Sequence, residues 1–223
     1  MNVLVYIVGF FVLSLIARAF RTRAIKFSSP PRIQLFHTAV SGQHGKDLAA
    51  RKAELDGCGL KRIGTYRIDP LNVMASAFVN EQESICAVVY HHPVVGCFVD
   101  VVSKNTAGKS FTATNAPTGG ALDHREGQEK VFDKSKSISE LFELTKQRRP
   151  EGPYETWTPE NFIKKFETAY AEDMDWRARR GGVTKEEVRR QAQASGKVYS
   201  EDVIDKATST LQKKFAESRQ DVR

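Results

Sequence analysis

The chain has 223 residues, of which 40% are hydrophobic and 27% are charged. This composition excludes a disordered chain, a collagen and a multi-span membrane protein, and an odd count of three cysteines excludes a disulfide scaffold. The net charge of +7 would fit a nucleic-acid binder, but residues 1–32 hold five basic residues and no acidic one, which leaves only +2 for the remainder.

The first segment of the chain is strongly apolar. Residues 1–17 carry no charged side chain, and extended to Phe20 the segment would form a helix of about 30 Å, enough to cross a bilayer. The basic residues that follow it are Arg18, Arg21, Arg23 and Lys26. Because Lys and Arg beside a span stay in the cytoplasm, residues 1–20 are predicted to be an anchor in the lipid bilayer, with a cytoplasmic body.

A cleaved signal peptide is the alternative for this segment, since Ala17-Arg18-Ala19 has the form of a cleavage site. Met1-Asn2 supplies no basic side chain ahead of the apolar run, which favours the uncleaved anchor. Residues 21–45 follow as a basic stalk that contains Pro30-Pro31, which should be extended.

Residues 46–150 are predicted to form an α+β domain. A short helix over Lys46–Leu55 precedes five segments with the period-2 pattern and β-branched residues of strands. These expected strands are Gly64–Asp69, Asn72–Val79, Ser84–His91, Cys97–Ser103 and Ser110–Asn115. Short connections favour a mainly antiparallel, five-stranded meander packed on helices, with the fifth strand at its edge and a helix over Ile138–Gln147 after it.

Residues 151–223 are predicted to be a helical C-terminal region with three helices. Thr158 with Pro159 starts the first helix, Thr184 with Glu187 forms a capping-box pattern for the second, and Ser200 caps the third. The apolar face of the last helix provides candidate residues for binding a protein partner: Val203, Ile204, Leu211 and Phe215. The basic stretch around Trp176 follows acidic residues at 172, 173 and 175, so no nucleic acid is expected as a partner.

One end of the predicted sheet collects polar residues. In a meander the turns after Asp69 and His91, together with the long loop 116–130, lie at the same end. The candidate ligand-binding residues at this end are Asp69, His91, His92, Asn115, Asp123 and His124. His91 and His92 should point to opposite faces of the sheet, and no spacing of histidines or cysteines indicates a metal site or a cofactor.

Catalytic signals are sparse. Cys97, next to Gly96 and near the histidines, is the one plausible thiol nucleophile, but no oxyanion-hole pattern accompanies it. The catalytic residues therefore remain unassigned. The expected function is non-enzymatic binding or scaffolding at a membrane, and the alternative is a membrane-tethered hydrolase that uses the histidines at the sheet end.

Overall fold

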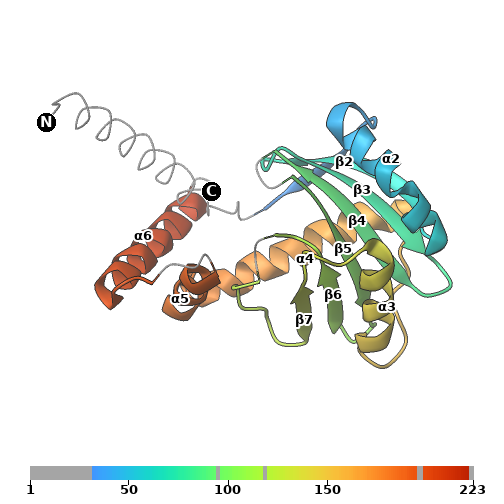
Figure 1. The fold of residues 1–223 in the computed structure, drawn as a ribbon. Helices are drawn as coiled ribbons and strands as arrows, with labels where there is room; N and C mark the ends of the chain where they lie inside the picture. The colour runs from blue at the N-terminus through green and yellow to red at the C-terminus, as the bar shows by residue number, and fades with distance from the viewer. Residues whose placement is uncertain (1–31, 94–95, 118–119, 195–197, 221–223) are drawn as a thin grey trace, which may run out of the picture.

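The computed structural model describes residues 32–93, 96–117, 120–194 and 198–220. Within these ranges, seven strands and five helices follow one another (Figure 1). In chain order they are β1 (Gln34–His37), α2 (Gly42–Gly57), β2 (Lys61–Asp69), β3 (Val73–Asn80), β4 (Ile85–His92), β5 (Gly96–Lys104), β6 (Ser110–Thr114), β7 (Gln128–Phe132), α3 (Ile138–Arg148), α4 (Pro159–Arg179), α5 (Lys185–Ala194) and α6 (Glu201–Gln220).

All seven strands belong to one sheet, whose spatial order is the chain order β1 to β7. Strands β1 to β6 pair antiparallel. The connections between β2 and β6 are short, as in the predicted meander, whereas α2 lies between β1 and β2. Strand β7 instead runs parallel to β6, with Ser110 opposite Gln128 and Thr114 opposite Phe132. The long segment that follows β6 returns the chain to the start of that strand before β7 begins.

The predicted fold class is therefore wrong in its count of five strands and in placing β6 at the edge. Strand β1 has only four residues, which is too short for a period to be read, and it falls within the segment predicted as a stalk. Strand β7 has the sequence QEKVF, whose charged residues resemble a solvated loop. Both added strands lie at the sheet edges, where one neighbour is enough to hold them.

The predicted fold class also included a transmembrane helix, and this part is corrected as well. In the described ranges, no helix combines the length and the apolar character needed to cross a bilayer. The longest, α4 with 21 residues, carries charged residues along its whole length. The predicted span over residues 1–20 and its flanking residues Arg18, Arg21, Arg23 and Lys26 lie outside the described residues. The assignment of the chain as a single-pass membrane protein thus has no support in the fold.

Helices α2 and α3 cover one face of the sheet, while α4 crosses the other face (Figure 1). Strand alternation assigns the side chains, because successive residues point to opposite faces. On β5, Val99 and Val101 join the core under α2 and α3, whereas Phe98 and Asp100 face α4. The first of these two layers is filled by buried apolar side chains of β3 to β6, α2 and α3.

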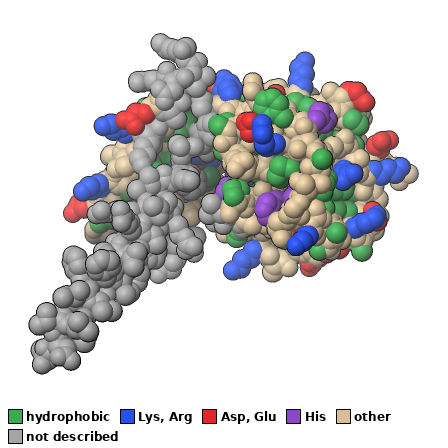
Figure 2. Space-filling model, turned by 90° about the horizontal axis from the view of Figure 1, so that it is seen from above, with side chains coloured by type: hydrophobic (Ala, Val, Ile, Leu, Met, Phe, Trp, Pro, Cys, Tyr) green, Lys and Arg blue, Asp and Glu red, His purple; other side chains and the backbone are tan. Residues whose placement is uncertain are grey.

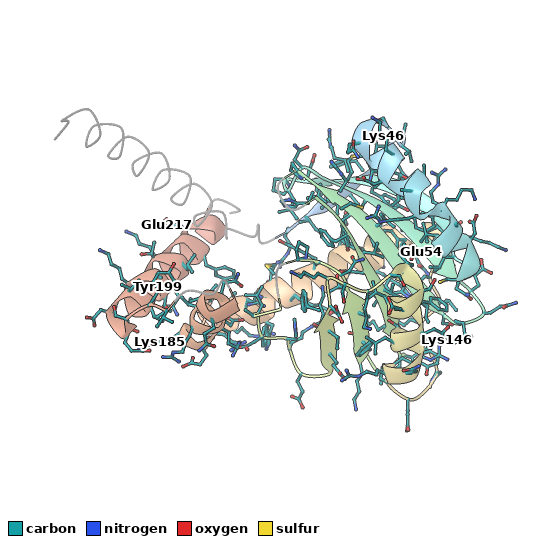
Figure 3. All side chains as sticks on the ribbon, viewed as in Figure 1. Lys46, Glu54, Lys146, Lys185, Tyr199 and Glu217 are labelled. Atoms are coloured by element: carbon teal, nitrogen blue, oxygen red, sulfur yellow. The ribbon has the colours of Figure 1, made fainter. Side chains whose placement is uncertain are left out.

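Local contacts tie α3 to α2. Ser137 caps α3 through a capping box with Glu140, and the next backbone amide, that of Ile138, donates to Glu54 Oε2 of α2 at 2.7 Å. Figure 3 labels Glu54 where α2 passes the start of α3. The two helices therefore form one covering layer.

Helix α4 is anchored to the edge of the sheet near β1. Arg32 makes two hydrogen bonds to Asp175, at 2.9 and 3.0 Å, and the Leu35 amide donates to Glu167 Oε1 at 2.7 Å. The aromatic ring of Phe162 stacks on Tyr66 of β2 with centroids 5.1 Å apart. These contacts hold α4 against β1 and β2.

Helices α5 and α6 pack together beside the sheet, beyond the end of α4 (Figure 1). Figure 3 labels Tyr199, which precedes α6, and Glu217, which lies in the last turn of this helix. The capping box predicted at the start of α5 is present, since the Thr184 amide donates to Glu187 Oε2 at 2.8 Å and the Glu187 amide donates to Thr184 Oγ1 at 3.2 Å. Gly182, with φ +93°, lets the buried ring of Phe215 approach the backbone before α5.

Candidate functional site

A cavity of about 560 Å³ lies between α4 and the face of the sheet that α4 crosses. Its walls come from β2 to β7, from the loop between β6 and β7, and from α4. This volume lies within the usual range of about 300–1,000 Å³ for small-molecule pockets. The cavity is thus large enough for a small organic ligand.

The end of the cavity beneath the first half of α4 is apolar and aromatic. The lining side chains at this end come from β2, β3, β4 and α4 and from the segment before α4: Ile68, Val73, Val88, Trp157, Phe162, Phe166 and Tyr170. The ring of Phe162 contacts those of Trp157 and Phe166, at centroid distances of 6.2 and 5.5 Å. Such a wall offers dispersion contacts and apolar surface to a ligand.

The other end, beneath β5 to β7 and the second half of α4, is charged. Lys130 Nζ of β7 donates to Asp100 Oδ2 of β5 at 3.2 Å. Arg125 Nε lies 2.8 Å from Asp173 Oδ1 of α4, an ion pair that is not aligned as a hydrogen bond. Burial raises the pKa of Asp173, although the charge of Arg125 opposes the shift. The cavity is therefore amphipathic along its length.

The loop wall of the cavity is held by the C-terminal helices. Arg180 and Arg190 both pair with the carboxylate of Asp123, and Arg177 Nη2 donates to its carbonyl oxygen at 2.7 Å. The Asp123 amide in turn donates to Glu187 Oε1 at 2.7 Å. The loop that carries His124 and Arg125 into the cavity is consequently fixed by α4 and α5.

Two of the six predicted ligand-binding residues, His92 and His124, line this cavity. Burial lowers the pKa of both, with the charge of His91 adding to the shift of His92, and those of Lys130 and Arg177 adding to the shift of His124. Both imidazoles are therefore neutral at neutral pH. The ring of His124 stacks on Phe132 of β7, with centroids 6.3 Å apart.

The other four predicted residues have structural contacts elsewhere. Asp69 pairs with Arg67 on β2, and Asp123 binds the C-terminal helices. Asn115 closes the end of β6, since its Oδ1 accepts from the Val99 amide at 2.7 Å and its Nδ2 donates to the Lys136 carbonyl at 3.2 Å. His91 points to the opposite face from His92, as strand alternation requires, so the structure does not join the six into one site.

His91 belongs to a polar cluster between α2 and the sheet. Its Nδ1 lies 2.7 Å from Asp47 Oδ2, and its ring centre lies 6.3 Å from that of His44. His44 Nε2 lies 2.9 Å from Ser76 Oγ, and this hydroxyl also hydrogen-bonds Thr65 at 2.7 Å. His44, Ser76 and Thr65 are buried, so this chain of hydrogen bonds fastens α2 to β2 and β3.

The cysteines are not activated for nucleophilic attack. Cys97 lies opposite His91 in the pairing of β4 and β5, but burial raises the pKa of its thiol and the neighbouring Asp47 adds to that shift. Cys86 lines the cavity, and burial raises the pKa of this thiol as well. Both thiols stay protonated at neutral pH, whereas a nucleophilic cysteine needs a lowered pKa.

The predicted partner face on α6 is divided between interior and surface. Ile204 and Phe215 are buried, Leu211 is half-buried, and Val203 is 48% exposed.

Over the face of the molecule shown in Figure 2, Lys and Arg side chains are interspersed with Asp and Glu. Within the described ranges, no group of three or more His, Cys, Asp or Glu side chains could hold a metal ion.

Comparisons of this chain with protein-family models, with curated proteins and with solved structures give no match. The functional argument therefore depends on the cavity itself. Sequence reasoning missed three residues at its charged end, Asp100, Lys130 and Asp173. The available signal was Asp100, a charged residue inside the apolar run from Cys97 to Val102, which alternates with Phe98 and Val102 on one face.

Proposed function

We propose that this protein binds a small amphipathic organic molecule in the cavity between α4 and the sheet. The observation that carries the proposal is the distribution of the lining residues, with aromatic and aliphatic side chains at one end and charged and polar side chains at the other. Ligand sites in proteins combine an apolar wall with a few polar groups that orient the ligand. This role is non-enzymatic, as we expected from the sequence, and the ligand that we propose is a small molecule.

The hydrolase alternative receives less support from the same residues. His92 and His124 share the cavity, but His91 faces away from them. The cavity thiol of Cys86 is buried, and its raised pKa keeps it protonated. Covalent hydrolysis requires an activated nucleophile next to a base, so a binding role accounts for this cavity better.

The proposal is tested by filling the cavity. Ala169 lines it from α4, whereas the preceding residue, Thr168, is exposed. Binding of the neutral dye N-phenyl-1-naphthylamine to the purified full-length chain is measured by its fluorescence. Ala169→Trp should weaken dye binding by about tenfold or more, which corresponds to about 1.4 kcal/mol, because the new ring occupies the ligand volume. Thr168→Trp should leave the affinity unchanged.

A second variant guards against misfolding of the first. Leu122→Trp fills the same cavity from the loop wall, and thermal melts identify any variant that does not fold. All variants keep residues 1–31, so any dye bound by that apolar segment cancels in the comparison. If both folded cavity variants bind the dye like Thr168→Trp, the proposal is wrong.

A further inference from the structure

Three buried polar atoms at the charged end of the cavity make no hydrogen bond to any described residue, and two of them, Arg125 Nε and Asp173 Oδ1, form an ion pair with each other, which leaves Asp100 Oδ1 as the third. Asp100 faces α4 because it alternates on β5 with Val99 and Val101, which are buried on the opposite face. Its Oδ2 accepts from Lys130, but its Oδ1 is buried and makes no hydrogen bond to any described residue. A buried carboxylate oxygen without a donor is costly, so such atoms in proteins are almost always paired, if not by protein then by water or a ligand.

The cations around the cavity are already engaged. Four cationic side chains of the described lining each have a carboxylate partner: Lys104 with Glu155, Arg125 with Asp173, Lys130 with Asp100 and Arg177 with Glu187. A ligand carboxylate or phosphate entering here would have to compete with these partners. A hydrogen-bond donor on a ligand would instead meet Asp100 Oδ1, an acceptor that makes no hydrogen bond to the described residues.

The neutral polar groups of this end are consistent with the same ligand chemistry. Ser110 and Thr112 line the cavity from β6, and His124 lines it as a neutral imidazole. The phenol of Tyr90, next along the same cavity face, also stays neutral, because burial and the nearby Asp100 charge raise its pKa well above the ordinary value. None of these groups adds a positive charge that would attract an anion.

We infer that the ligand carries a hydrogen-bond donor, as a hydroxyl or a protonated amine, which binds the free carboxylate oxygen of Asp100 while its apolar part lies against α4. This inference rests on the proposed function. It narrows the ligand class to amphipathic molecules that carry a hydrogen-bond donor, in preference to amphipathic carboxylates. Asp100 is the specificity-determining residue in this assignment, and Lys130 holds its carboxylate in place.

A matched ligand series tests the inference. Octylamine, 1-octanol and octanoate share the same chain length and differ in the polar group. Each is used at pH 7 to displace N-phenyl-1-naphthylamine from the full-length chain. Octylamine, 1-octanol or both should displace the dye at concentrations about tenfold lower than octanoate, the ratio expected for one hydrogen bond to a charged group. If octylamine displaces the dye more strongly than 1-octanol, the ligand is assigned as a cation. If the two displace it equally, the donor of the ligand is assigned as a hydroxyl.

Asp100→Asn gives a readout that a purely structural role would not produce. The amide removes the charged acceptor and releases Lys130, so the order should invert, with octylamine weakened about tenfold and octanoate strengthened. Glu126→Gln, at an exposed loop position outside the cavity lining, removes one negative charge nearby and should keep the wild-type order.

The outcomes separate this inference from the proposed function. Preference of the wild type for octanoate, equal displacement by all three compounds, or no displacement by any of them overturns the inference. An unchanged order in folded Asp100→Asn overturns it too. In each case the proposed function still stands if Ala169→Trp or Leu122→Trp weakens dye binding, and it fails independently if both folded variants bind the dye like Thr168→Trp.

Discussion

Glu187 is the most informative residue for testing how the cavity wall is held. Its carboxylate is buried and accepts four hydrogen bonds: from the Thr184 amide at 2.8 Å and hydroxyl at 3.4 Å, from the Asp123 amide at 2.7 Å and from Arg177 Nη1 at 3.0 Å. These contacts connect α5, the cavity loop and α4. Glu187→Gln keeps the shape of the side chain, but replaces one acceptor oxygen by a donor that must oppose a partner's N–H.

The expected loss of stability is large for the replacement of a single atom. A hydrogen bond to a charged group contributes about 1.5–3 kcal/mol, and removing one partner of a buried ion pair costs about 3–5 kcal/mol. Because glutamine retains one acceptor oxygen, we expect Glu187→Gln to lower the free energy of unfolding by about 2–4 kcal/mol. Urea denaturation at pH 7 with linear extrapolation measures this difference.

The pH dependence of the free energy of unfolding provides an independent test, because the direction of the change follows from the pKa of Glu187. Burial alone would raise the pKa of Glu187, but the hydrogen bonds from Thr184, Asp123 and Arg177 hold it below the ordinary value. A lowered folded-state pKa stabilises the protein above the unfolded value of about 4.3, and this contribution is lost as the pH falls through the folded pKa. The stability gap between wild type and Glu187→Gln should therefore shrink below about pH 4.3.

The neighbouring residue provides the control. The Glu186 side chain is 64% exposed, and its contact with Arg189 is a long one of 3.7 Å, so Glu186→Gln should change stability by less than about 0.5 kcal/mol. If the two variants unfold alike, the hydrogen-bond network around Glu187 does not stabilise the fold, and our account of the cavity wall is wrong.

Two further changes probe other parts of the fold. Gly182→Ala should cost about 1–3 kcal/mol in a urea melt, because φ is +93° and the new Cβ would lie 3.2 Å from Phe215, whereas Gly57→Ala, with open space and no positive φ, should cost nothing. The pKa of buried His44 is lowered, first by burial and then by the His91 charge. The unfolded protein therefore binds a proton at this imidazole more readily than the folded protein does. As a result, the contribution of His44 to the free energy of unfolding falls as the pH drops below about 6.5. His44→Asn should flatten the pH dependence of unfolding between about pH 7.5 and 5.5, and a slope equal to that of wild type would contradict this role.

Periodicity located the central strands because their residues are buried on one or both faces. The expected Ser84–His91 and the observed Ile85–His92 differ by one residue at each end. The same alternation correctly placed His91 and His92 on opposite faces. Helix starts were also predictable, since a capping box such as that of Thr184 and Glu187 is a contact within four residues.

The cavity could not be predicted in the same way, because its groups meet across long stretches of chain. Asp123 was expected at a pocket rim from its place in a polar loop, but Arg180 and Arg190, 57 and 67 residues later, hold it instead. Lys130 lies in an edge strand with no periodic pattern, so its pairing with Asp100 was not visible either. Tertiary ion pairs of this kind leave no local signal in a single sequence.

The cavity follows from the different coverage of the two faces of the sheet. Seven strands about 4.8 Å apart span roughly 29 Å, whereas a helix with its side chains is about 10–12 Å wide. On one face, both α2 and α3 pack against the sheet. On the other face, α4 is the one helix of the described residues that packs near β1 to β4, and the loop that carries His124 and Arg125 lines the cavity beside β5 to β7. A loop carries polar side chains where a helix would present an apolar stripe, so the incompletely filled side of this layer is also its charged side, with Asp100 beneath it.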